Sequence, residues 1–256
     1  MSRHPQPSSR PTVSAADDVV EPQPLAAIVA HDLAKDYGDG PALWPLTLRI
    51  EIGERVALIG HNGSGKTTFL RLASGLLQPA SGTVTIFGQP TGSLAARRHL
   101  SFIADTPTFY DDLSVWEHLE YTARLHGMTE WEQEAADLLG TLGIYERADD
   151  LPNRFSRGLK QKAAIALAFI RPFDLLLVDE PFVGLDADGK DALLSLFDDA
   201  HQSGATLVVA THELGFVTTA QRTIALRDGH LIFDGDSSNT EARQLVSTED
   251  PSSPPE

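Results

Sequence analysis

Residues 60–67, GHNGSGKT, fit the pattern G-x-x-x-x-G-K-[ST] at every fixed position. A triphosphate needs many hydrogen-bond donors, and glycines let consecutive backbone N–H groups converge on its phosphates. We expect a helix after Gly65 to add its positive end, Lys66 to reach the β- and γ-phosphates, and Thr67 to ligate Mg²⁺. The alternative, an ordinary glycine-rich turn before a helix, is disfavoured by the full pattern. The predicted phosphate-binding residues are Gly60, His61, Asn62, Gly63, Ser64, Gly65, Lys66, Thr67 and Thr68.

Two carboxylates and a histidine stand where apolar runs end. Asp179 follows the run LLLV, which predicts a buried strand whose end lies at the ligand-binding edge of a doubly wound sheet. Asp179 is placed to hold Mg²⁺ through water, and Glu180 to act as general base or to position an attacking water. His212 ends LVVAT in the same topological position and could donate a hydrogen bond to a γ-phosphate. The alternatives are two carboxylates that begin a loop and a strand-end histidine with a structural bond.

The elements around these residues predict an α/β fold. RVALI at 55–59 leads into the glycine loop, and KTTFLRLASGLL after it has helical spacing. Continuous apolar strands at 174–181 and 205–212 alternate with helices, which predicts a mostly parallel sheet covered on both faces. Alternating segments at 26–33 and 46–52, with a turn at 37–42 between them, predict an antiparallel addition at one edge.

The rest of the chain divides into a domain and two tails. Residues 25–246 form the predicted domain, and a helical subdomain occupies about 106–160. Residues 1–24 and 247–256 are rich in Pro and Ser and are predicted to be disordered tails. Further strands are expected at 83–87 and 100–104, helices at 155–172 and 186–204, and a hairpin at 222–235.

Composition excludes several function classes. The net charge of -16 and the lack of a long basic run make a nucleic-acid partner unexpected. The absence of cysteine excludes disulfides, thiolate metal sites and a cysteine nucleophile. No apolar run approaches the roughly 20 residues of a membrane-spanning helix, and the N-terminus does not read as a secretory signal. The sequence therefore predicts a soluble, intracellular protein that a partner could hold at a membrane.

From about residue 26 to 236 the chain resembles a nucleotide-binding subunit of the ATP-binding-cassette (ABC) transporters. The phosphate loop, LLLVDEP and VVATHE match that family's nucleotide and hydrolysis motifs, and residues 184–186, GLD, match the loop that pairs two cassettes. The resemblance implies a P-loop NTPase core and places Tyr37 where the family stacks an aromatic ring on adenine. The alternative for Tyr37 is a packing aromatic.

The segment FSRGLKQ at 155–161 resembles the family signature, usually L-S-G-G-Q. Ser156 and Gly158 match, whereas Arg157 and Leu159 replace a glycine and the glutamine, as in exporter-like branches. Ser156 is expected to open a helix and form an anion site with nearby N–H groups. In the family this site covers the γ-phosphate bound to the opposite subunit, which implies a head-to-tail homodimer with two ATP molecules. Arg157 is either a solvent-facing charge or an added phosphate contact.

Asp105 is the clearest departure from the family. A glutamine that touches Mg²⁺ and water, and that links the core to the helical subdomain, normally stands there. Asp105 could ligate Mg²⁺, but its charge would repel phosphates unless the metal offset it. By resemblance, the aromatic region from Phe109 to Tyr121 receives a helix of the membrane subunit; the alternative is subdomain core.

These observations lead to one hypothesis: an ATP-binding and ATP-hydrolysing subunit that powers a separate transmembrane permease, with the signature variant favouring export. The expected cofactors are ATP and Mg²⁺, with Lys66, Glu180 and His212 as catalytic residues and Thr67, Asp179 and Asp105 as metal ligands. The permease would hold the cytoplasmic subunit at the inner face of the cell membrane. The alternatives are a soluble ABC ATPase that acts on ribosomes or DNA, and a non-catalytic ATP-gated binding module.

Overall fold

The computed structural model describes residues 25–240 and residue 244, so the tails predicted at 1–24 and 247–256 lie outside the described residues. In chain order the elements are β1 (Ile28–Asp36), β2 (Pro41–Ile50), β3 (Arg55–Ile59), α1 (Lys66–Ala73), β4 (Ser81–Ile86), β5 (Gln89–Pro90), α2 (Leu94–His99), β6 (Leu100–Ile103), α3 (Val115–Leu125), α4 (Glu132–Thr141), the 3-10 turns η1 (Tyr145–Arg147) and η2 (Pro152–Arg154), α5 (Arg157–Phe169), β7 (Leu175–Asp179), α6 (Ala187–Gln202), β8 (Thr206–Ala210), α7 (Leu214–Val217), β9 (Arg222–Arg227) and β10 (His230–Asp236).

A six-stranded sheet with the order β10-β9-β3-β8-β7-β6 forms the centre of the molecule. Its strands are parallel except for β10, which forms the predicted hairpin with β9. Both faces of the sheet are buried: on β7, Leu175 and Leu177 belong to one hydrophobic cluster, and Leu176 and Val178 belong to the other. Burial on both faces is the reason why these strands read as continuous apolar runs.

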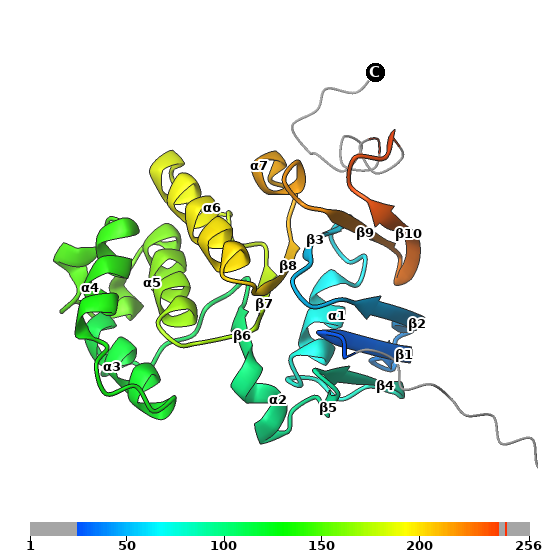
Figure 1. The fold of residues 1–256 in the computed structure, drawn as a ribbon, viewed down its shortest axis with the longest axis horizontal. Helices are drawn as coiled ribbons and strands as arrows, with labels where there is room; N and C mark the ends of the chain where they lie inside the picture. Colours follow the sequence, from blue (N-terminus) through cyan, green and yellow to red (C-terminus); the bar gives the residue numbers. More distant parts are fainter. Residues whose placement is uncertain (1–24, 241–243, 245–256) are drawn as a thin grey trace, which may run out of the picture.

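The early strands form a second, antiparallel sheet of order β2-β1-β4-β5. It is a separate sheet and does not extend the edge of the parallel one, because α1 packs between the two (Figure 1). Phe69, Leu70 and Leu72 on α1 are fully buried there. The predicted turn at 37–42 is shorter than expected, since β2 already begins at Pro41; proline is tolerated as the first residue of a strand.

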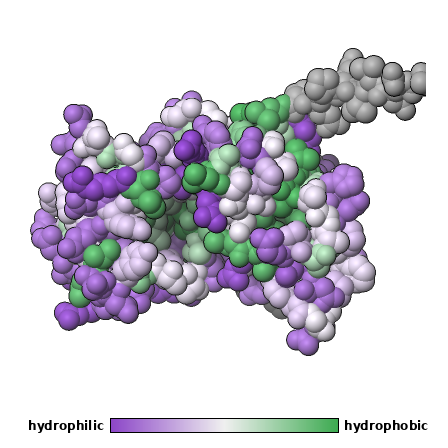
Figure 2. Space-filling model, turned by 90° about the horizontal axis from the view of Figure 1, so that it is seen from below, coloured by the Kyte–Doolittle hydropathy of each residue, from purple (hydrophilic) through white to green (hydrophobic). Residues whose placement is uncertain are grey.

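The helices α3, α4 and α5 form a separate helical part beside β6 (Figure 1). Ser114 and Glu117 form a reciprocal capping box at the start of α3. The chain enters this part just after β6 and leaves it through α5, so both of its ends adjoin the parallel sheet. The face in Figure 2 is largely hydrophilic, with separate hydrophobic patches and a hollow between the helical part on the left and the rest of the molecule on the right. None of the helices in the described residues has both the length and the apolar character needed to cross a membrane.

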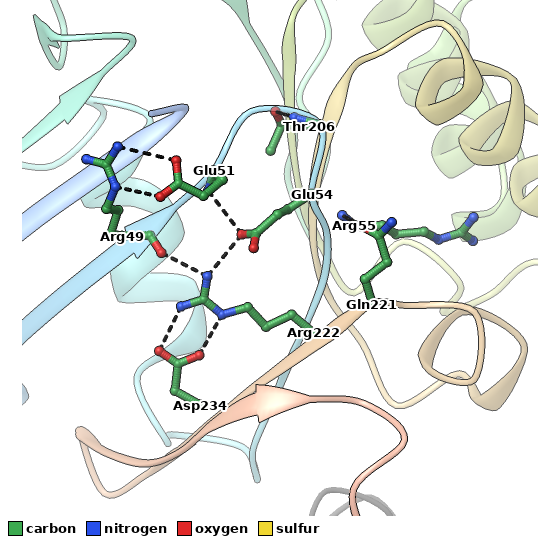
Figure 3. Close-up of polar contacts among 9 residues, drawn as sticks. Arg49, Glu51, Glu54, Arg55, Thr206, Gln221, Arg222 and Asp234 are labelled. Atoms are coloured by element: carbon green, nitrogen blue, oxygen red, sulfur yellow. Dashed lines mark hydrogen bonds and ion pairs between the residues drawn. The ribbon is translucent and has the colours of Figure 1, made fainter. Parts of the chain in front are cut away.

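Arg222 joins the two sheets at the edge opposite the ends of β7 and β8 (Figure 3). Its guanidinium donates to both carboxylate oxygens of Asp234 at 2.6 and 2.8 Å, to Glu54 at 3.0 Å, and to the carbonyl oxygen of Arg49 at 2.9 Å. The hydrogen bond to Asp234 is the largest cause of the raised pKa of Arg222, and Glu54 adds to it. The Arg222 side chain is 19% exposed, and its contacts link β9 with β10, with the end of β2 and with the residue before β3.

Candidate functional site

A cavity of about 830 Å³ lies where α1 begins and where β7 and β8 end. This is the ligand-binding edge of an open α/β sheet. Most of the residues predicted from the sequence line it: His61, Asn62, Gly63, Ser64, Gly65, Lys66, Thr67, Thr68, Asp105, Asp179, Glu180 and His212.

The phosphate loop has the predicted strand–loop–helix context, between β3 and α1. Gly60 has a φ of 146°, and a Cβ there would collide with the carbonyl oxygen of Leu226, so only glycine fits. Gly65, at φ 106°, is the N-cap of α1. Gly229 donates its N–H to the carbonyl oxygen of Ser64 at 3.0 Å, so the phosphate loop contacts the β9–β10 turn. The first N–H groups of an α-helix have no acceptor within the helix, so those at the start of α1 can face an anion in the cavity.

Lys66 is buried, with 6% of its surface exposed. Its ammonium donates to the carbonyl oxygen of Gly60 and lies 3.5 Å from Glu180 Oε1. A cation held this deeply beside converging N–H groups is a strong electrostatic anchor for phosphate.

Asp179 is 2% exposed at the end of β7. Burial raises its pKa, a hydrogen bond with Thr67 opposes that rise, and the charges of Glu180 and Asp105 add to it. Its Oδ1 is buried and accepts no hydrogen bond from any described residue. A carboxylate oxygen without a donor, next to the Thr67 hydroxyl, has the chemistry of a metal-ligand pair.

The described residues contain no group of three or more His, Cys, Asp or Glu side chains placed to hold a metal by themselves. Mg²⁺ in nucleotide sites usually takes only one or two carboxylates, and phosphate oxygens and waters complete its shell. Thr67 and Asp179 fit that pattern, so the residues present suit Mg²⁺ bound together with a phosphate ligand.

Glu180 has left-handed backbone geometry, with a φ of 47°, which is strained for a residue with a side chain. This turns its carboxylate away from the line of β7 and into the cavity, where His212 Nε2 lies 3.4 Å from its Oε1. That oxygen is buried and accepts no hydrogen bond within the described part of the chain. Glu180 thus presents an acceptor at the place where a water could bind.

Asp105 and Arg157 also line the cavity, and they contact each other. Arg157 Nη2 lies 3.3 Å from Asp105 Oδ1. Arg157 is largely exposed, as expected of a solvent-facing charge, yet its contact with Asp105 was not predicted. The contact joins residues 52 positions apart, which no local pattern could show.

Four predicted residues do not line the cavity: Tyr37, Gly60, Ser156 and Gly158. Tyr37 is 55% exposed, with Lys35 Nζ 5.3 Å from its ring centre. Ser156 caps α5, as predicted, and accepts from the N–H of Leu159 at 3.4 Å. Gly158 lies against the 184–186 loop, where a Cβ would collide with the carbonyl oxygen of Gly184.

Besides the contact of Arg157 with Asp105, sequence reasoning missed three features of the site. Ala42 and Val183 line the cavity although neither belongs to a motif. Lys162 on α5 is paired with Asp186 at 2.9 Å, which attaches the signature helix to the 184–186 loop. The only signal for this pair was an opposite charge just after the 155–161 segment and another within residues 184–186.

The aromatic region after Asp105 divides between core and surface. Val115 and Leu119 are buried, as the core alternative predicted, and Phe109 and Trp116 pack partly against the same cluster. Tyr110 and Tyr121 are 56% and 49% exposed, with ring centres 5.8 Å apart.

Comparison with known sequences identifies residues 43–183 with the family model described as ABC transporter. The SkfA peptide export ATP-binding protein SkfE of Bacillus subtilis is 36% identical over 207 residues, which are 80% of this chain and 87% of that protein. The macrolide export ATP-binding/permease protein MacB of Rhodopseudomonas palustris is 36% identical over 222 residues, which are 82% of this chain. The match covers 34% of MacB, so this chain spans about a third of that relative's length.

Solved structures show the same architecture. An ATP-binding subunit of an ABC transporter superposes with a TM-score of 0.77 at 31% identity, over 82% of this chain and 90% of that one. The cassette MJ0796, in a dimeric post-hydrolysis state bound to ADP and Pi, superposes with a TM-score of 0.75 at 27% identity, over 82% of this chain and 98% of that one. These likenesses confirm the α/β fold with its parallel sheet, antiparallel sheet and helical part.

Proposed function

The chain belongs to the ABC transporter family of ATP-binding proteins, and from that premise we propose that it hydrolyses ATP to power a separate membrane-spanning permease. The observation that carries the proposal is the convergence of Lys66, Asp179, Glu180 and His212 on one cavity from α1, β7 and the end of β8. A site that only binds phosphate would need Lys66. It would not need the strained carboxylate of Glu180 beside His212.

Each residue has a role that its position supports. Lys66 and the N–H groups of the phosphate loop hold the β- and γ-phosphates, with Thr67 and Asp179 as ligands to Mg²⁺. When bound, Mg²⁺ offsets the charge of the phosphates. Glu180 orients the attacking water and accepts its proton, and His212 steadies the γ-phosphate. Asp105 faces the same cavity and would offer a further oxygen ligand when Mg²⁺ is bound. Tyr37 would stack on adenine after its side chain turns from solvent.

The ATP-bound form is proposed to be a head-to-tail homodimer. Ser156 and Gly158 open α5 but do not line the cavity of their own chain. They are therefore available to close over a nucleotide held by a second copy. The dimeric state of MJ0796 with ADP and Pi supports this arrangement.

The transport partner is a separate permease, and the direction is export. SkfE and MacB are both named for export, and the signature variant points the same way. Tyr110 and Tyr121 provide an exposed aromatic pair on the helical part for a helix of that permease. The subunit is then peripheral on the cytoplasmic face of the membrane.

ATPase activity tests the proposal. The purified chain, alone and with the membrane protein that copurifies with it, should release Pi from ATP, and Lys66→Ala should abolish the release. Absence of turnover above the Lys66→Ala variant in both preparations would favour a non-catalytic ATP-gated module. Copurification with ribosomes or DNA in place of a membrane protein would favour a soluble ABC ATPase.

A further inference from the structure

The contact between Asp105 and Arg157 closes the base of the helical part. Asp105 lies two residues after β6, and Arg157 is the first residue of α5. The two side chains therefore join the points where residues 106–156 leave and re-enter the sheet domain. Both line the nucleotide cavity, so the contact lies at the site and at the junction together.

This pair is unsuited to a role in folding stability. The Arg157 and Asp105 side chains are 63% and 45% exposed, and their closest atoms are 3.3 Å apart. Ion pairs with this exposure and length contribute little to folding because water screens them. Their position at the edge of the cavity instead favours a role in ligand binding.

Charge balance in the cavity supplies that role. Asp105, Asp179 and Glu180 face it, and among the described residues Lys66 and Arg157 are the lysine and arginine that line it, together with His61 and His212. An unbalanced third carboxylate would repel the phosphates of a nucleotide.

Arg157 is held in place to balance that charge. The arginine stem runs beside the 184–186 loop, since a Cβ added at Gly184 would lie 3.4 and 3.5 Å from Arg157 Cγ and Cδ. Lys162 fastens the same helix to that loop through Asp186 at 2.9 Å. The guanidinium is thus directed toward Asp105 by its own helix and by the loop.

We propose that Arg157 is a positioning residue that neutralises Asp105, so that this cavity accepts a nucleotide without needing a divalent cation to balance that carboxylate. Relative to the family pattern, Asp105 adds one negative charge and Arg157 adds one positive charge, and the two departures compensate within one chain. The inference rests on the proposed ATP site and identifies a residue pair that sets how strongly nucleotide binding depends on metal.

Calorimetric binding of ATP to the full chain, with Mg²⁺ and separately with EDTA, tests this inference. Arg157→Ala should weaken ATP binding about tenfold in EDTA but only about twofold with Mg²⁺, because the metal then offsets Asp105. Arg157→Gln provides a second variant with a similar stem and the same expected loss. In the double variant Asp105→Asn with Arg157→Ala, the ATP affinity measured in EDTA should return to within about threefold of that of the unaltered protein.

The pair Arg147 and Asp150 provides the matched control. It has the same residue types and similar exposure, 57% and 48%, with a distance of 3.0 Å, but it does not line the cavity. Arg147→Ala should change ATP affinity less than twofold in either buffer. Equal effects of Arg157→Ala and Arg147→Ala would overturn the inference.

Three other outcomes would also overturn it. An Arg157→Ala loss that is equal with and without Mg²⁺, and that Asp105→Asn does not rescue, would mean that Arg157 contacts the phosphates directly. Failure of the unaltered protein to bind ATP would overturn the proposed function, and this inference with it. If the unaltered protein binds ATP but the effects of Arg157→Ala and Asp105→Asn on ATP affinity are additive, the inference is overturned and the proposed function is not.

Discussion

Lys66 Nζ lies 3.5 Å from Glu180 Oε1, so the phosphate-loop lysine contacts the carboxylate that we propose as the water-positioning group. His212 Nε2 lies 3.4 Å from the same oxygen. A γ-phosphate that attracts Lys66 would compete with Glu180 for the lysine. We therefore expect nucleotide binding to alter the orientation of Glu180 through this one buried ammonium group.

Glu180→Gln should separate binding from hydrolysis. The amide keeps the shape of the side chain but cannot accept a proton, so Pi release should fall by about 10²–10⁴-fold, the usual contribution of a general base. ATP affinity should remain within a few-fold of the unaltered protein. Phosphate-release kinetics measure the first effect, and size exclusion with ATP and Mg²⁺ should show an accumulated dimer. Turnover equal to that of the unaltered protein would remove Glu180 from the mechanism.

Gly158→Ala should destabilise the fold, because the added methyl group collides with the carbonyl oxygen of Gly184. Such overpacking typically lowers the free energy of unfolding by about 1–3 kcal/mol, which corresponds to a fall of roughly 2–12 °C in Tm for a chain of this size. Gly140→Ala is the matched control: Gly140 is also helical, and a Cβ there meets no atom within 4 Å. It should be neutral or stabilising by up to about 1 kcal/mol. Thermal unfolding that lowers the two Tm values equally would show that the Gly184 contact is not tight.

The buried elements were predictable from the sequence because their patterns are local. RVALI became β3 at the predicted residues, and the two other continuous apolar runs became β7 and β8. Short elements were missed: β5 has two residues, and α7 has four, too few for a periodic pattern. The antiparallel strands were recognised, but not their separation from the parallel sheet, since the position of α1 between the sheets is a tertiary arrangement.

The site divides in the same way. The phosphate loop, Asp179, Glu180 and His212 come together because each ends or begins an element at one sheet edge, a position that the sequence predicts. The contact of Arg157 with Asp105 depends on the path of the whole helical part between them. The direction of Tyr37 depends on side-chain rotation in an exposed turn, for which residue spacing gives no information.

Lys162→Met should raise the pKa of Asp186. The hydrogen bond from Lys162 is the largest cause that holds this pKa below its ordinary value of 3.8, and the N–H of Gly189 also contributes. A depressed carboxyl pKa stabilises the fold at pH values above the unfolded-state pKa, and that stability is lost as the pH falls through the folded-state pKa. As the pH is lowered below about 4, the free energy of unfolding of the variant should therefore fall less than that of the unaltered protein. Carboxyl-resolved NMR titration measures the pKa, and an unchanged value would contradict the pairing.

Arg222→Lys should destabilise the fold although it preserves the charge. A lysine cannot reproduce the two parallel hydrogen bonds to Asp234 together with those to Glu54 and the Arg49 carbonyl, so partly buried acceptors lose their donors. The expected loss is about 1–3 kcal/mol in the free energy of unfolding, measured by urea denaturation. Arg124→Lys is the control, because Arg124 is 62% exposed and forms a surface ion pair with Glu120 at 2.7 Å on the same helix. It should change the free energy by less than about 0.5 kcal/mol. Equal losses in the two variants would mean that the Arg222 network does not hold the two sheets together.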